Sequence, residues 1–149
     1  MMKKLFLITF ALLFSFVING CEKKDNRAFK KVHWDRDMCQ RCKMVVSDRK
    51  NTTEVRNPDN GKTYMFDDIG CAILWFHDNH IVWQDKAVIW ITDAKTGKWI
   101  DARKAFYDTN NITPMAYGFC AHLNRSDINS SEEIVDFKEM KKRVIKIGK

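Results

Sequence analysis

The order of strand-like and helix-like patterns constrains the fold of this chain more than any other feature. Short segments rich in β-branched residues precede an apolar stripe at helical spacing, and the same order recurs in the second half. We predict strands at 43–47, 52–57, 62–66, 87–92, 98–101 and 117–123. Strands followed by a helix, twice over, favour an α+β fold of two related ββα-type units, each with a small antiparallel sheet and one packed helix.

Capping residues indicate where the two helices begin. Asp67 or Asp68 is expected to cap a helix that ends near Asn79. Ser130 and Glu133 have the spacing of a capping box for a last helix. The apolar stripe of that helix would consist of Ile134, Phe137, Met140, Val144 and Ile147.

The first 20 residues have the composition of an export signal rather than of a folded element. Lys3 and Lys4 precede an apolar run at 5–18, which is shorter than the ~20 residues needed to span a bilayer. Gly20-Cys21 at its end resembles the junction of a bacterial lipoprotein signal, in which Cys21 is lipidated and anchors the protein to a membrane. An ordinary signal peptide whose junction happens to contain Cys21 is the alternative.

Length then limits the mature protein to one domain. Removal of residues 1–20 leaves 129 of the 149 residues, enough for a single domain with its own core. We expect the anchor cysteine and a tether at 21–36, followed by one domain at 37–149. The two units of that domain would span about 37–85 and 86–149.

The net positive charge of the chain limits the chemical classes of partner that it can bind. The net charge of +7 falls to +5 when Lys3 and Lys4 are removed with the leader. Much of this excess lies near the C-terminus, at Lys138, Lys141, Lys142, Arg143, Lys146 and Lys149. In an exported protein these cations favour anionic head groups or an acidic partner protein over nucleic acid, unless they form only a solvated helix face.

Two thiols and a thioether lie within six residues in the run CQRCKM at 39–44. Such sulfur ligands are soft, and together they favour Cu(I) over hard cations. If 43–47 is a strand, Cys42 and Met44 share one face of it, and Cys39 can fold back towards Cys42. The sequence therefore predicts a copper clamp.

The C-x-x-C motif also has other meanings. A haem attachment motif needs a histidine where this chain has Lys43, and a zinc ribbon needs a second ligand pair of similar spacing. A thioredoxin-type dithiol belongs at the start of a helix, whereas β-branched residues follow here. Two alternatives stay open: an exported thiol–disulfide redox protein that uses Cys39 and Cys42, and a structural Cys39–Cys42 disulfide. Cys71 and Cys120 would then be available for a second bridge.

The four histidines of the chain do not form a complete set of metal ligands in the sequence. His33 precedes the clamp by six residues and is either a further copper ligand or an ordinary surface histidine. His77 and His80 have a spacing that metals use, but no third ligand is close in sequence, which favours a solvent-facing helix end. His122 stands alone.

Four features of the chain occur together in one known family. Cys39-x-x-Cys42-x-Met44 forms the clamp, FDDIGC at 66–71 begins the first helix, and TPMAYGF at 113–119 precedes a late strand. Together with the lipoprotein leader, these motifs resemble the NosL copper-binding lipoproteins in the same order over nearly the whole chain. The family usually has glycine where this chain has Lys43, and Cys120 is not associated with the family's site.

The resemblance implies a membrane-anchored periplasmic Cu(I) chaperone that is not an enzyme. Such proteins carry copper towards nitrous-oxide reductase, whose copper centres are assembled outside the cytoplasm with an ABC-type transporter apparatus. It also implies a fold of two ββα-containing units. Glu22 does not resemble the aspartate retention signal of enteric bacteria, so the anchor is not assigned to the inner or the outer membrane.

Ligand chemistry then predicts how copper would be held and passed on. Met44 and one or both of Cys39 and Cys42 would hold Cu(I) in an exposed site of low coordination number. Met115, which follows Pro114 on a loop of the second half, would close over the ion. A ligand from the partner would then replace the protein sulfurs one bond at a time.

Overall fold

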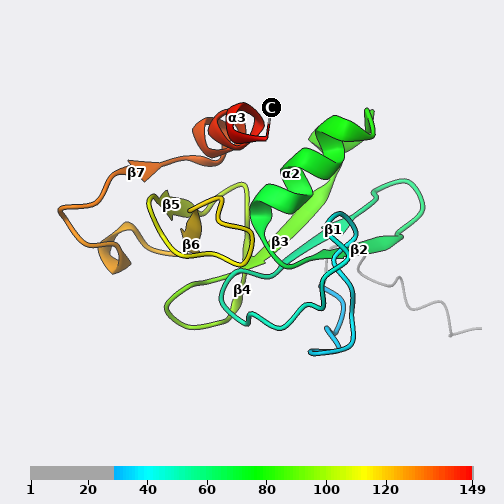
Figure 1. Ribbon diagram of the computed structural model, residues 1–149, viewed down its shortest axis with the longest axis horizontal. Helices are drawn as coiled ribbons and strands as arrows, with labels where there is room; N and C mark the ends of the chain where they lie inside the picture. Colours follow the sequence, from blue (N-terminus) through cyan, green and yellow to red (C-terminus); the bar gives the residue numbers. More distant parts are fainter. Residues whose placement is uncertain (1–28, 149) are drawn as a thin grey trace, which may run out of the picture.

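Two α-helices and two small antiparallel sheets make up the part of the chain that the computed structural model describes, residues 29–148 (Figure 1). The elements follow in the order β1 (Thr53–Arg56), β2 (Thr63–Phe66), α2 (Ile69–Asp78), β3 (Val88–Thr92), β4 (Trp99–Asp101), β5 (Phe106–Asp108), β6 (Cys120–His122), β7 (Ile134–Val135) and α3 (Phe137–Ile147). Short 3-10 turns lie at Gln84–Lys86 and Arg125–Asp127. The predicted α+β class, with two small antiparallel sheets and two helices, is confirmed.

The first sheet has the strand order β2-β1-β3-β4, with every neighbouring pair antiparallel. Val55 pairs with Ile89, and the alternation of side chains along a strand puts Ile91 on the same face as these two. All three are buried in the core that this face forms with α2. Since β3 and β4 complete the sheet that β1 and β2 begin, this sheet draws strands from both halves of the sequence.

The chain that precedes the clamp packs onto the other face of this sheet. The Phe29 ring stacks on Trp99 with centroids 5.6 Å apart, and Val32 is buried. The Lys30 amide donates a hydrogen bond of 2.7 Å to Glu54, whose side chain is completely buried. Residues 29–36, the described part of the predicted tether, thus contribute to the core.

The second sheet has the order β6-β5-β7, and α3 packs against both β5 and α2. Tyr107 of β5 is fully buried and donates its hydroxyl to the Ala102 carbonyl at 2.7 Å. Met140 and Val144 of α3 are completely buried, as expected for their helical spacing. The two sheets and the two helices therefore share one continuous apolar core.

Most predicted elements are confirmed, with boundaries shifted by one or two residues. The strands predicted at 52–57, 62–66, 87–92 and 98–101 correspond to β1, β2, β3 and β4. Asp68 is the N-cap of α2 and accepts a hydrogen bond from the Gly70 amide at 2.8 Å. The strand predicted at 117–123 is limited to β6, and β5 and β7 were not predicted.

Two predictions about local structure are wrong. Residues 43–47 are not a strand, because Lys43 has a φ of 63° and only Val45 forms an isolated bridge, to Met38. The last helix begins at Phe137 under an Asp136 cap, so Ser130 and Glu133 do not form its capping box. Ile134 belongs to β7 instead of this helix.

The predicted leader and the anchor at Cys21 lie outside the described residues. Within residues 29–148, neither helix has the length and apolar character required to cross a membrane.

Candidate metal centre

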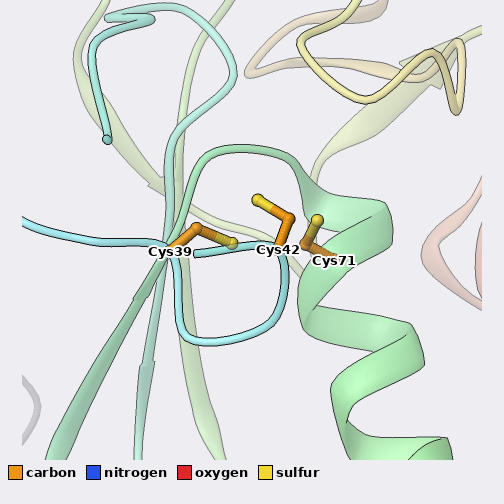
Figure 2. A group of neighbouring side chains, drawn as sticks. All are labelled: Cys39, Cys42 and Cys71. Atoms are coloured by element: carbon orange, nitrogen blue, oxygen red, sulfur yellow. The ribbon is translucent and has the colours of Figure 1, made fainter. Parts of the chain in front are cut away.

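Three cysteine sulfurs converge beside the start of α2. The Sγ atoms of Cys39, Cys42 and Cys71 all lie within 4.8 Å of one another, and they are the one such group of metal-ligating side chains in residues 29–148. Figure 2 shows that Cys39 and Cys42 come from the loop before β1, whereas Cys71 comes from the first turn of α2. Residues distant in sequence therefore form one thiol cluster.

A tight turn brings the first two sulfurs to the helix. The Cys39 amide donates to the Met44 carbonyl at 2.8 Å, and the Lys43 amide donates to the Cys39 carbonyl at 3.1 Å. The turn closes through Lys43, whose positive φ is a conformation that glycine adopts without steric cost. The Gln40 amide also donates to the Met65 carbonyl at 2.8 Å, which fixes the turn to the edge of β2.

The third sulfur is positioned by the helix start. Asp68 caps α2, and Cys71 follows in the first turn, where it is completely buried. Gly70 permits close packing here, because a Cβ atom at this position would lie only 2.2 Å from Cδ2 of Tyr117. The segment that carries Tyr117 thus packs directly on the helix start at Gly70, the residue before Cys71.

The three thiols do not share one protonation state. A hydrogen bond from Cys71, helped by the Asp67 and Cys42 amides, lowers the pKa of Cys39 to about 5, although burial opposes this effect. The hydrogen bond to Cys39, together with burial, raises the pKa of Cys71 far above its usual range. Burial likewise raises the pKa of Cys42. The hydrogen bond between these two thiols thus favours the charged form of Cys39 over that of Cys71, and this arrangement favours a cation close to the sulfurs.

The carboxylates of Asp67 and Asp68 lie near the sulfur cluster. Burial raises the pKa of Asp67, which also accepts a hydrogen bond from the Ser47 amide at 3.4 Å. Burial also raises the pKa of Asp68, which accepts from Gly70 and, at 3.3 Å, from the Met115 amide. Of the two candidate caps, Asp68 is the one that caps α2, and each aspartate also accepts a hydrogen bond from a neighbouring loop.

The two predicted methionine ligands occupy different positions. Met44 is half-exposed, with 49% of its surface accessible, two residues beyond Cys42. Met115 packs against the core from the loop between β5 and β6, and its amide is bound to Asp68 at the helix start. The structure brings Cys39 and Cys42 together as predicted and adds Cys71 to them. Cys21 was predicted for lipidation and lies outside the described residues.

The remaining cysteine is separate from the cluster. All four cysteines of residues 29–148 are free thiols, and Cys71 lies with Cys39 and Cys42 rather than with Cys120. Cys120 is buried and donates its thiol to Oδ1 of Asn51 at 3.3 Å. The alternative second bridge is therefore not formed in this structure.

Histidines do not join the sulfur cluster in the described part of the chain. His33 is exposed and faces Asp37, with Nδ1 3.5 Å from the carboxylate. His77 and His80 are exposed at the end of α2. His122 is buried, and its Nε2 lies 3.0 Å from Oδ2 of Asp108.

Sequence reasoning missed Cys71 as a member of the site. The available signal was its position three residues after the Asp68 cap, because a thiol in the first turn of a helix is exposed to the positive end of the helix dipole.

Comparison with known proteins identifies a structural relative. Scans with protein-family models and against curated proteins give no match. Among solved structures, the chain is similar to the crystal structure of the copper chaperone NosL from Shewanella denitrificans, with a TM-score of 0.63 and 14% sequence identity. The match covers 74% of this chain and 94% of that one. The chain therefore has a NosL-like fold, in agreement with the family resemblance of its motifs.

Proposed function

We propose that this protein is a membrane-anchored copper chaperone that carries Cu(I) in the cluster of Cys39, Cys42 and Cys71. The observation that carries the proposal is the convergence of three free thiols within 4.8 Å of one another. The NosL-like fold supports it, because the similar structure is that of a copper chaperone.

The chemistry of the donors favours Cu(I) over other metals. Thiolates are soft ligands that select Cu(I), zinc or iron–sulfur clusters, whereas Mg²⁺ and Ca²⁺ prefer oxygen. A structural zinc site almost always has four protein ligands, and no fourth histidine, cysteine or carboxylate in residues 29–148 joins this group. Two or three sulfurs suffice for Cu(I), so the cluster fits this ion best.

Burial indicates the route by which the ion is exchanged. Cys39 and Cys71 are completely buried, whereas Cys42 is half-buried and Met44 is half-exposed. An ion bound at the buried thiols would therefore meet solvent and partner proteins on the side of Cys42 and Met44. Met44 supplies a soft ligand there, and Met115 supplies another from the loop fastened to Asp68. Copper is the cargo and no substrate bond is broken, so the proposed role is not enzymatic.

The predicted leader and the family resemblance supply the location and the destination in this proposal. Lipidation of Cys21 would hold the domain at the periplasmic side of a membrane. Delivery would be towards nitrous-oxide reductase, with the ABC-type apparatus that matures it as the partner.

An anaerobic Cu(I) titration tests the proposal. The protein would be residues 22–149, which contain every element of both sheets and both helices. In competition with bathocuproine disulfonate, we expect tight binding of about one ion per chain, or one shared by a dimer. Cys39→Ser should weaken this binding by at least about 100-fold, because even the outer partners of metal ligands contribute 10- to 100-fold. Absence of binding by the reduced protein would refute the proposal.

A thiol–disulfide redox protein is the second candidate, and the lowered pKa of Cys39 favours it. The complete burial of Cys39 argues against it, because exchange requires access for an external disulfide. Met44→Ala separates the two functions. It should weaken Cu(I) binding if the protein is a chaperone, and leave the dithiol–disulfide potential unchanged if it is a redox protein.

A further inference from the structure

Arg41, between the two clamp cysteines, connects three separate segments around the sulfur cluster. Its Nε donates to Oδ2 of Asp78, at the end of α2, at 3.1 Å. Its Nη1 donates to the Tyr117 hydroxyl at 3.0 Å. The Arg41 side chain is only 29% exposed. A planar guanidinium can make two such directed bonds at once, which a lysine ammonium matches poorly.

The Tyr117 end of this connection lies directly over the helix start. The Tyr117 ring fills the space where Gly70 lacks a side chain, one residue before Cys71. Two residues earlier on the same segment, the Met115 amide is bound to Asp68. The segment 113–118 is therefore fastened on one side to the start of α2 and on the other to the turn at 39–44, called the clamp turn below.

The backbone of this segment shows that its position depends on these contacts. Ala116 has a φ of 57° and Gly118 a φ of 82°, so the chain turns sharply on either side of Tyr117. A non-glycine residue in this conformation is strained and persists only when neighbouring contacts hold it. The Arg41–Tyr117 hydrogen bond is one of those contacts.

We propose that Arg41 is a positioning residue of the copper site, which latches Tyr117, and with it the segment that carries Met115, over the sulfur cluster. This inference rests on the proposed copper function. It adds that the contact between Arg41 and Tyr117 sets the rate at which bound Cu(I) leaves the protein. While the latch is closed, the Met115 segment stays fastened to Asp68, three residues before Cys71, and bound Cu(I) leaves slowly. Because the latch is one hydrogen bond between two partly accessible side chains, a partner that contacts Arg41 or Tyr117 would open it and release the ion.

The test is the rate at which Cu(I) passes from the loaded protein to excess bathocuproine disulfonate. Tyr117→Phe keeps the ring on Gly70 and removes only the hydroxyl. We expect it to accelerate transfer about tenfold or more, as the loss of one hydrogen bond to a charged group implies. Arg41→Gln should accelerate transfer at least as much. Arg41→Lys should fail to restore the wild-type rate, although it keeps the charge.

Matched controls separate the latch from a general loss of stability. Tyr107→Phe removes a buried hydroxyl hydrogen bond in β5, and Arg103→Gln removes an arginine bound to the Gln84 carbonyl. Both should leave the transfer rate unchanged. In a Met115→Ala background, Tyr117→Phe should lose most of its effect, because latch and methionine act through one segment.

The outcomes distinguish this inference from the function on which it rests. If the wild-type protein binds no Cu(I), the proposed function is refuted. If it binds Cu(I) but Tyr117→Phe and Arg41→Gln transfer it at the wild-type rate, the latch is refuted and the chaperone stands. A wild-type rate for Arg41→Lys would also refute the latch, because charge alone would then be sufficient.

Discussion

The clamp turn and the hairpin of β5 and β6 both bury a cysteine among other polar groups, yet their groups are paired in different ways. In the hairpin, the Cys120 thiol donates to Asn51, and the Asp108 carboxylate accepts from both His122 and Asn111. In the clamp region, the principal side-chain partner of the Cys39 sulfur is the thiol of Cys71.

This difference shows what separates a candidate metal site from a buried polar network. The Asp108 carboxylate faces an N–H donor at each of its two oxygens and therefore has no remaining need for a cation. Thiols whose hydrogen-bond partners are one another and backbone amides favour a thiolate, which is a ligand for a soft cation. The presence of cysteine or histidine alone would not have distinguished the two regions.

The largest expected effect is on stability, in the hairpin. His122→Leu leaves the buried Asp108 carboxylate with one partner fewer, and should cost about 3 kcal/mol of unfolding free energy, because a charged group loses a buried hydrogen bond. Urea unfolding measures this loss. Copper affinity should stay within about twofold of the wild-type value, since a change below ~0.4 kcal/mol is expected at a separate site. A tenfold loss of copper affinity in the folded variant would show that the two regions are not independent.

Two serine substitutions compare the regions directly. Cys71→Ser and Cys120→Ser replace equally small, buried thiols with the same group. We expect Cys71→Ser to weaken Cu(I) binding about 100-fold, because it removes a proposed ligand, and Cys120→Ser to leave it unchanged. X-ray absorption should show one sulfur fewer around copper only in the Cys71 variant. Equal affinities for the two variants would contradict a three-sulfur site.

A third buried group tests whether incomplete pairing explains the difference. Glu54 is as buried as Asp108, but its Oε1 has no hydrogen-bond partner among the described residues. Burial raises the pKa of Glu54 from 4.5 to about 7. The folded protein therefore holds this proton more tightly than the unfolded chain, and the associated stability is present in full below pH 4.5 and is lost as the pH rises through 7.

The loss should amount to about 2.8 kcal/mol between pH 4.5 and 7.5, because the pKa rises from 4.5 to about 7 at ~1.4 kcal/mol per pKa unit and the titration is incomplete at both ends of this interval. Urea unfolding at several pH values measures it, and Glu54→Gln should remove this part of the pH dependence. If the wild type and Glu54→Gln have parallel pH profiles, the raised pKa is not a property of the folded state.

The sequence predicted those parts of the fold that depend on local pattern. Strands β1, β2 and β3 show clear β-branched segments, and Asp68 marks the start of α2. The strands β5 and β7 are only three and two residues long, so pairing with distant segments defines them rather than their own composition. Such short strands contain too few residues to show the alternation of apolar and polar side chains by which a strand is predicted.

The candidate site was predictable only in part for the same reason. The spacing of Cys39 and Cys42 is local, and it indicated soft-metal chemistry without a structure. Cys71 is distant from Cys39 and Cys42 in sequence. It joins them only because the turn at 39–44 packs on the start of α2 (Figure 2). Arg41 and Tyr117 carry no sequence signal for their contact, because it arises from the same tertiary packing.

The smallest expected effect concerns the residue that misled the strand prediction. Val45 and Val46 have the composition of a strand, but Lys43 adopts a φ of 63° and turns the chain before it can extend. Lys43→Gly removes the steric cost of this conformation, roughly 1 kcal/mol. The greater entropy that glycine gives to the unfolded chain offsets part of this gain in stability. It also removes an exposed hydrogen bond from Nζ to the Gln40 carbonyl.

The balance should stabilise the protein by about 0.5 kcal/mol, with copper affinity unchanged, because glycine restores the backbone preference of the turn without touching a sulfur. Lys98→Gly is the matched control. Lys98 is not among the positive-φ residues of the described chain, so glycine there should destabilise. Midpoints of urea unfolding compare the two variants. Equal destabilisation by both would mean that the clamp turn does not hold Lys43 in the left-handed conformation, and the geometry that brings Cys42 to Cys71 would then need another explanation.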